Sequence, residues 1–163
     1  MSSQSPEPSS ITLRPAAPDD HDFLLEVYAS TRAEELALVP WTSEQRDVFV
    51  RSQFAAQQEH YAQKYPAASH DIILFEGRPV GRLYVARLDQ EIRIIDITLM
   101  PGERNAGIGS CLIRQLLDEA KRFGKVTRIY VEEFNPSLRL FERLGFSPTE
   151  QHGIHLLLRW SGS

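Results

Sequence analysis

The sequence contains a single cysteine, Cys111, among 163 residues. One cysteine excludes an internal disulfide and a zinc site built from several thiolates. Basic residues are not in excess, because 18 lysines and arginines stand against 22 aspartates and glutamates, for a formal net charge of −4. A chain with this balance has no overall attraction for nucleic acid or for an anionic membrane. Any anionic ligand must therefore be bound by local groups.

Long apolar runs are also missing, and none approaches the roughly 20 residues that a membrane-spanning helix requires. The first ten residues, MSSQSPEPSS, have neither the basic start nor the apolar centre of a secretory signal. We therefore expect residues 1–10 to be a disordered tail. Residues 11–163 have the length of one domain with a substantial core. These features predict a cytoplasmic protein.

Strand and helix patterns alternate along the chain and predict an α/β fold with a mixed sheet. The strand at 126–131 follows a helical crossover, so it should lie parallel to the strand at 92–99. The predicted strands are residues 11–14, 70–75, 80–88, 92–99, 126–131 and 153–160, and helical patterns begin after residues 18, 42, 107 and 135.

Asp96 lies in the strand at 92–99, which is apolar on both faces, with Ile92 and Ile94 on one face and Ile95, Ile97 and Leu99 on the other. Such strands lie in the middle of a sheet that helices cover. A buried carboxylate needs a partner or has a functional use as a base. Arg82 is the candidate partner, but a two-residue turn at residues 89–90 would set Asp96 opposite Leu83, with Arg82 on the other face. Both interpretations stay open.

Residues 99–112, LMPGERNAGIGSCL, join this strand to an amphipathic helix through a glycine-containing loop. Glycines allow close backbone approach, and the free N–H groups of a first helical turn bind anions such as phosphate. The Walker pattern fails because Ile108 follows Gly107 where lysine is required, and the dinucleotide pattern fails because Leu112 replaces its third glycine. The pattern that is present is R-x-x-G-x-G, at residues 104–109.

A second segment, residues 131–146, reads VEEFNPSLRLFERLGF. Asn135 followed by Pro136 is a helix-start signal, and Gly145 is a stop signal. Together with the strand, the R-x-x-G-x-G loop and its helix, the order N-P-x-x-x-x-[YF]-x-x-x-G-F resembles the GNAT superfamily of N-acetyltransferases. The resemblance covers roughly residues 11–160. It implies about seven strands with helices on both faces.

The resemblance also implies acetyl-CoA as co-substrate. Arg104 and the loop N–H groups would hold the pyrophosphate, and the pantetheine would bind to the backbone of the fourth strand where the fourth and fifth strands splay. Asn135 would contact coenzyme A, and the Phe141 ring would lie beside the thioester. The implied coenzyme A residues are Ile97, Thr98, Leu99, Arg104, Asn105, Ala106, Gly107, Ile108, Gly109, Ser110, Asn135 and Phe141.

The implied chemistry is direct attack of a primary amine on the thioester after Asp96 or Glu132 removes its proton, with or without an intervening water. The Leu99 N–H would polarise the carbonyl. Many family members have a tyrosine where this chain has Phe141, and its hydroxyl protonates the leaving thiolate. Tyr130, Ser137 or water could serve instead, or the thiolate could leave unassisted, since a thiol pKa near ~8.5 makes it a fair leaving group.

Trp41 and Tyr28 are the candidate acceptor-binding residues, because the family shapes its acceptor pocket from the segment between the first two strands. The acceptor is a small molecule or a protein, with no nucleic acid or membrane partner, and family members often form dimers. No metal is expected, since His152 and His155 lack a third ligand nearby. The alternative function is an acyl-CoA-binding module without transfer, motivated by the missing tyrosine.

Overall fold

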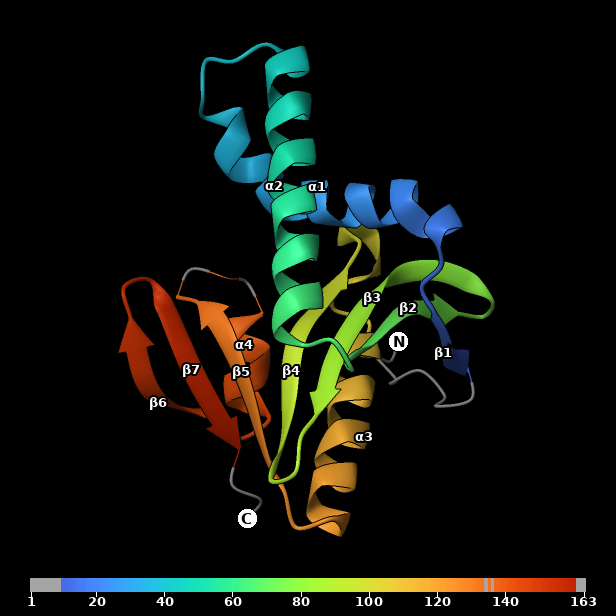
Figure 1. Cartoon of the computed structure of the whole chain (residues 1–163), viewed down its shortest axis with the longest axis vertical. Coiled ribbons are helices and arrows are strands. Elements are labelled where there is room, and N and C mark those ends of the chain that lie inside the picture. Colours follow the sequence, from blue (N-terminus) through green and yellow to red (C-terminus); the bar gives the residue numbers. More distant parts are fainter. Residues whose placement is uncertain (1–9, 134, 136, 161–163) are drawn as a thin grey trace, which may run out of the picture.

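Seven strands form one mixed sheet in the computed structural model, which describes residues 10–133, 135 and 137–160 (Figure 1). The strand order is β1-β2-β3-β4-β5-β7-β6. β4 and β5 are parallel, and all other neighbours are antiparallel. The strands are β1 (Ile11–Pro15), β2 (Ser69–Phe75), β3 (Arg78–Arg87), β4 (Glu91–Leu99), β5 (Val126–Glu132), β6 (Ser147–His152) and β7 (His155–Trp160). The predicted mixed α/β fold is confirmed.

Helices cover both faces of the sheet. Consecutive strand residues point to opposite faces, and in β2 Ile72 packs with Tyr28 and Phe54, whereas Ile73 belongs to the core that includes Ile113 and Phe141. Two helices therefore lie on each face. They are α1 (His21–Ala37) and α2 (Ser43–Lys64) on one face, and α3 (Ile108–Arg122) and α4 (Leu138–Arg143) on the other, with short 3-10 turns η2 (Pro18–Asp20) and η3 (Pro101–Glu103).

The parallel pair β4 and β5 is paired over only part of its length. Glu91–Ile94 pair with Val126–Ile129, whereas β4 continues to Leu99 and β5 to Glu132. The two strands diverge toward their carboxyl ends (Figure 1). The last residues of β4 therefore have no paired strand on the β5 side. We refer to the region where β4 and β5 diverge as the splay.

One extra residue interrupts the ladder between β3 and β4. Val85 pairs with Ile94, as the two-residue turn at residues 89–90 predicts, but the next pair is Tyr84 with Asp96. Ile95 is left without an opposite residue, which defines a β-bulge. All residues of β4 beyond this point are shifted by one position relative to a regular strand.

Because of this shift, the predicted division of the β4 side chains between the two faces of the sheet is wrong beyond Ile94. Ile97 and Leu99 pack against the same core as Ile92 and Ile94, on the side of α3, instead of pointing to the opposite face. Asp96 points toward α1 and α2. The bulge thus separates the apolar residues of the strand from its carboxylate.

Two elements of the structure differ from the sequence-based prediction. β6 was not expected, because its residues are all exposed and lack apolar alternation, and only its pairing with β7 makes it a strand. α4 begins at Leu138, later than Asn135, while Pro136 lies outside the described residues. Of the predicted tail, residues 1–9 also lie outside them, and the Ser10 carbonyl accepts a hydrogen bond from the Glu76 N–H at 2.8 Å. Within the described ranges, no helix is long and apolar enough to cross a membrane.

Candidate functional site

The carboxyl end of β4 presents backbone groups to the splay. The Met100 N–H donates to the Val80 carbonyl of β3 at 2.9 Å. Because alternate strand residues direct their backbone groups to opposite neighbours, Leu99 and Ile97 direct theirs away from β3, toward the splay. Thr98 has the reverse orientation. The structure thus makes Ile97 and Leu99, of the three predicted positions, the ones whose backbone can bind an extended ligand there.

The glycine loop adjoins this edge. The Arg104 Nε donates to the Leu99 carbonyl at 3.1 Å, which holds the guanidinium between the splay and the loop. Asn105 and Gly107 have left-handed backbones, with φ of 62° and 87°. This conformation disfavours most side chains and explains the glycine at position 107. The loop therefore turns sharply into α3.

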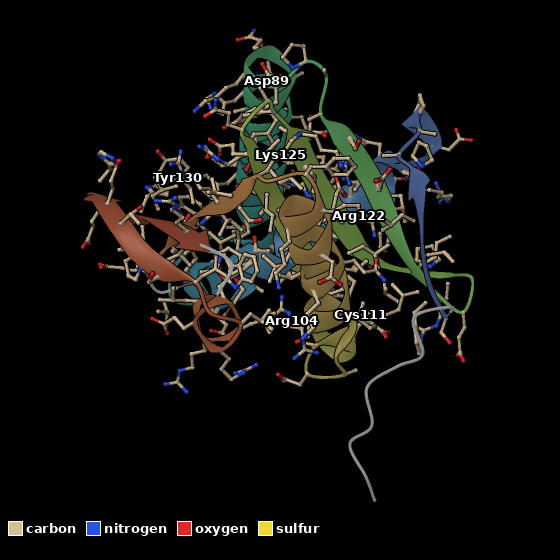
Figure 2. All side chains as sticks on the ribbon, turned by 90° about the horizontal axis from the view of Figure 1, so that it is seen from below. Asp89, Arg104, Cys111, Arg122, Lys125 and Tyr130 are labelled. Atoms are coloured by element: carbon tan, nitrogen blue, oxygen red, sulfur yellow. The ribbon has the colours of Figure 1, made fainter. Side chains whose placement is uncertain are left out.

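The first turn of α3 supplies free donors. The Cys111 N–H is bonded to the Gly107 carbonyl at 3.0 Å, so the N–H groups of residues 108–110 precede the helical ladder. Figure 2 shows Arg104 and Cys111 together at this end of the helix. A Cβ on Gly109 would come within 3.3 Å of the Leu140 Cδ2, so a larger residue there requires the Leu140 side chain of α4 to shift. This donor set suits a pyrophosphate.

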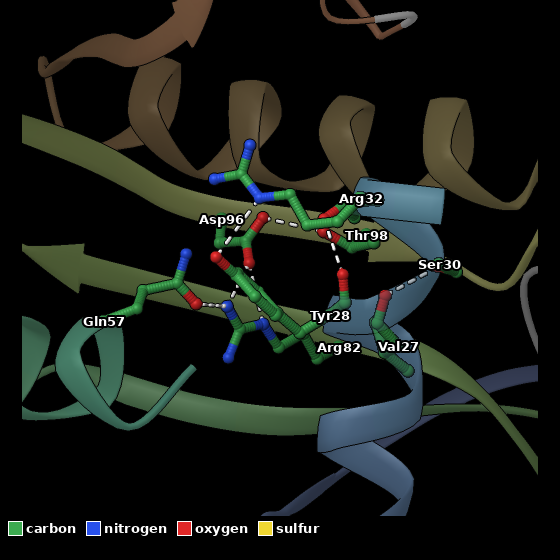
Figure 3. A network of polar contacts seen from close by, with 9 residues as sticks. Val27, Tyr28, Ser30, Arg32, Gln57, Arg82, Asp96 and Thr98 are labelled. Atoms are coloured by element: carbon green, nitrogen blue, oxygen red, sulfur yellow. Dashed lines mark hydrogen bonds and ion pairs between the residues drawn. The ribbon is translucent and has the colours of Figure 1, made fainter. Parts of the chain in front are cut away.

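Asp96 is part of a network across β3, β4 and α2 (Figure 3). Its Oδ2 accepts from the Arg82 Nε at 2.7 Å, and its Oδ1 accepts from the Thr98 hydroxyl at 2.8 Å. The Arg82 Nη2 donates to the Gln57 Oε1 at 2.6 Å, and the Arg82 side chain is 2% exposed. The bulge at Ile95 brings Arg82 and Asp96 to the same face. The expectation that Arg82 points to the other face is therefore wrong.

Aromatic rings surround this ion pair. His70 stacks on Tyr84 at 4.4 Å between ring centroids, and Tyr61 meets Tyr84 edge-on at 5.2 Å. Burial, with the nearby Asp96 carboxylate, raises the pKa of Tyr61 above its ordinary value. Burial, with the Arg82 charge, lowers the pKa of His70 to about 4. Both rings are therefore neutral at neutral pH.

Glu132, at the end of β5, lies on the opposite side of the splay from Asp96. Its Oε1 is 4.0 Å from the Arg32 Nη2 of α1, and its side chain is 26% exposed. The Arg32 Nε donates to the Tyr28 hydroxyl at 3.2 Å (Figure 3). Burial alone would lower the pKa of Arg32, but hydrogen bonds with Glu35 and Tyr28 raise it, so the guanidinium stays charged. We refer to the side chains of Glu132, Arg32 and Tyr28, on the α1/α2 face, as the splay mouth.

Trp41 lies in the segment between α1 and α2, packed against the cluster that contains Tyr28 and Phe54. Its ring packs on Phe49, 5.2 Å between centroids, beside the start of α2. The predicted contact of Trp41 with the acceptor stays a prediction, while Tyr28 lies beside the splay.

The second predicted segment contributes packing in the described part of the chain. Phe141 is fully buried and its ring meets Phe146 edge-on at 5.2 Å. The Asn135 Oδ1 accepts from the Ser137 N–H at 2.8 Å and from its hydroxyl at 2.7 Å. Tyr130, labelled in Figure 2, is 39% exposed on β5. The Arg93 guanidinium lies 5.2 Å from the centroid of its ring. The predicted contacts of these residues with coenzyme A or substrate stay predictions.

Arg32 and Gln57 had no sequence signal. Both lie on helices whose periodicity identifies their faces but not the strand that each face covers. The residue pattern does not predict the bulge at Ile95 either. A run of two isoleucines before Asp96 is compatible with a regular strand.

Comparisons with known proteins agree with this geometry. The model of the acetyltransferase (GNAT) family matches residues 28–146. The PaiA N-acetyltransferase of Thermoplasma acidophilum, solved with coenzyme A, has a TM-score of 0.70 and 16% identity, over 93% of this chain and 99% of that one. YncA of Salmonella typhimurium, a putative acetyltransferase solved with acetyl-CoA, has a TM-score of 0.55 and 19% identity, over 94% and 95%.

Naa50 of Arabidopsis thaliana, solved with a bisubstrate analogue, has a TM-score of 0.60 and 15% identity, over 93% of this chain and 99% of that one. A comparison with curated protein sequences finds no match. At these identities the solved structures establish the shared fold, while the family model spans well over half of the 163 residues. The chain therefore belongs to the acetyltransferase (GNAT) family, and it is an acyltransferase.

Proposed function

We propose that this protein transfers an acetyl group from acetyl-CoA to a primary amine by direct attack. The observation that carries the proposal is the splay between β4 and β5, which opens beside the free N–H groups of the loop and of α3. An extended backbone edge next to an anion site suits a long ligand with a phosphate end. Acetyl-CoA, when bound, supplies an activated thioester carbonyl.

Different groups of the chain bind different parts of acetyl-CoA. Arg104 and the N–H groups of residues 105–110 hold the pyrophosphate. The backbone of Ile97 and Leu99 orients the pantetheine, and the Leu99 N–H polarises the carbonyl. The fit has direct support, because the Arg104 guanidinium is already fixed between the loop and the splay.

Glu132 is the proposed base. Both carboxylate oxygens of Asp96 are already occupied by Arg82 and Thr98, whereas Glu132 has only the 4.0 Å approach of Arg32 among the described residues. Glu132 can therefore accept a proton from an amine at the mouth, directly or through water. Phe141 has no proton to donate. The Ser137 hydroxyl already donates to the Asn135 Oδ1, and the Tyr130 ring lies against the Arg93 guanidinium. We therefore propose that the thiolate leaves without an acid from the protein.

The cofactor site is tested by calorimetric titration with acetyl-CoA. Gly107→Glu adds bulk and negative charge at the N-terminus of α3 and should abolish binding. Gly124→Glu is the matched control, since Gly124 has φ of 68° beyond the other end of the same helix and open space around it. No binding by the folded parent, or equal binding by both variants, would contradict the proposed site.

The base is tested by thiol release with an amine acceptor. Glu132→Gln should lower turnover by about 100-fold while acetyl-CoA affinity stays unchanged. Turnover equal to the parent would remove Glu132 as the base. The second candidate, an acyl-CoA-binding module without transfer, is favoured by the buried Phe141 that replaces a hydroxyl donor. It predicts acetyl-CoA binding with no acetylated product for any amine.

A further inference from the structure

Three arginines lie side by side on three adjacent strands. Arg93 of β4 is in register with Arg128 of β5, and Arg128 is in register with Arg159 of β7. We refer to these three residues as the arginine row. Neighbouring strands are about 4.8 Å apart, so the row spans about 10 Å. Like charges directly opposite each other on a sheet are destabilising.

The arginine row lies on the α1/α2 face. The strand neighbours Ile92, Ile129 and Leu158 all point into the core beside α3, so the arginines between them point the other way. The Arg93 Nη1 lies 3.3 Å from the hydroxyl of Tyr65, the residue that follows α2. The row is therefore on the same face as the splay mouth.

The charge of the row is only partly compensated. Glu91 accepts from the Arg93 Nε at 2.8 Å and from the Arg128 Nη1 at 3.1 Å. Arg159 has no ion-pair partner in residues 10–133, 135 and 137–160. The Nε atoms of Arg128 and Arg159 are buried without a hydrogen-bond partner there. Three positive charges thus face one carboxylate in a chain of net charge −4.

The row and the proposed base lie on one continuous surface. Arg128 and Glu132 are four positions apart in β5, about 13 Å, and the half-exposed ring of Tyr130 lies between them. Glu132 favours an ammonium at the mouth, and the row favours an anionic group farther along the sheet. A ligand that satisfies both carries opposite charges roughly four extended residues apart.

We propose that the acceptor is an acidic peptide, whose amine lies at Glu132 and whose carboxylates contact Arg128 and Arg159. This inference rests on the proposed function for the position of the amine. The carboxylates pair with the solvent-facing parts of the two guanidinium groups and balance the positive charge of the row. A polycationic amine is repelled by the same surface.

The test uses direct binding to the full chain in the presence of coenzyme A. One probe is a hexapeptide with a free N-terminal amine and glutamates at its fourth and fifth positions. The second probe has glutamines there. The parent should bind the acidic probe at least tenfold more tightly, and Arg159→Gln should weaken that binding by about tenfold. Arg122→Gln, an exposed change at the end of α3, is the matched control and should bind like the parent.

Equal affinity of the two probes, or equal affinity of Arg159→Gln and parent for the acidic probe, would overturn the inference. A thermal melt confirms that Arg159→Gln is folded, and Arg159→Lys should retain most of the affinity because it keeps the charge. A parallel titration with acetyl-CoA separates the two proposals. Selective binding of the acidic probe without acetyl-CoA binding would contradict the proposed function and leave the acidic-peptide site supported.

Discussion

The Arg82 guanidinium is enclosed by β3, β4 and α2, and among the described residues its charge is matched by the Asp96 carboxylate alone. A buried ion pair adds little net stability compared with apolar groups of the same volume. Removing one partner is costly, however, because the other charge stays buried. Asp96 is therefore first a structural residue, whatever it contributes to the reaction.

Asp96→Asn should lower the free energy of unfolding by about 3 kcal/mol, since it leaves the buried Arg82 charge without a counter-charge. Urea denaturation at pH 7 measures this loss. The double variant Arg82→Met with Asp96→Leu should recover most of it. Unchanged stability of the single variant would mean that the ion pair does not hold in solution.

At the scale of the elements, the turn after α4 depends on one glycine. Gly145 has φ of 104°, and a Cβ at this position would lie 3.0 Å from the Trp160 Nε1 of β7. The glycine therefore permits both the left-handed turn and the close approach of α4 to the sheet. Its neighbour Phe146 then enters the core against Phe141.

Gly145→Ala should destabilise the protein by about 2 kcal/mol, through backbone strain and the contact with Trp160. Gly153→Ala is the control, because Gly153 also has a positive φ, 63°, but has nothing near its missing Cβ. Urea denaturation of both variants gives the comparison. A loss at position 145 no larger than at position 153 would show that the Trp160 contact is unimportant.

At the scale of the whole molecule, His70 makes the free energy of unfolding depend on pH. Its folded pKa of about 4 is below the ordinary value of 6.5, because the ring is buried and near Arg82. Between these two values the unfolded chain binds more protons than the folded chain. His70 therefore contributes stability fully above pH 6.5, and this contribution is lost as the pH falls toward 4.

His70→Phe keeps a ring against Tyr84 and removes the titrating group. Between pH 7 and pH 5 the parent should lose about 1 kcal/mol more unfolding free energy than this variant, a value reduced for the partly exposed ring. Urea denaturation at the two pH values measures both losses. Parallel losses in parent and variant would show that His70 titrates normally in the folded state.

Local signals in the sequence determined most of the secondary structure. The buried stripe of α3, the Thr42 N-cap of α2 and the strand-to-helix loop all appear where the residue pattern places them. Such features depend on neighbours within a few positions, so a single sequence contains the necessary information. The acetyltransferase family was equally accessible, because its loop motif is continuous in the chain.

Only the tertiary structure decided the side-chain arrangement at the splay mouth. One inserted residue, Ile95, reverses which face Asp96 occupies, and nothing local distinguishes a bulge from a regular strand. Arg32 approaches Glu132, and the arginine row lies on the same face, through strand order and helix placement, which depend on contacts between residues far apart in the chain. The sequence alone thus determined the family and the loop, whereas long-range packing decided which charged side chains lie at the splay mouth.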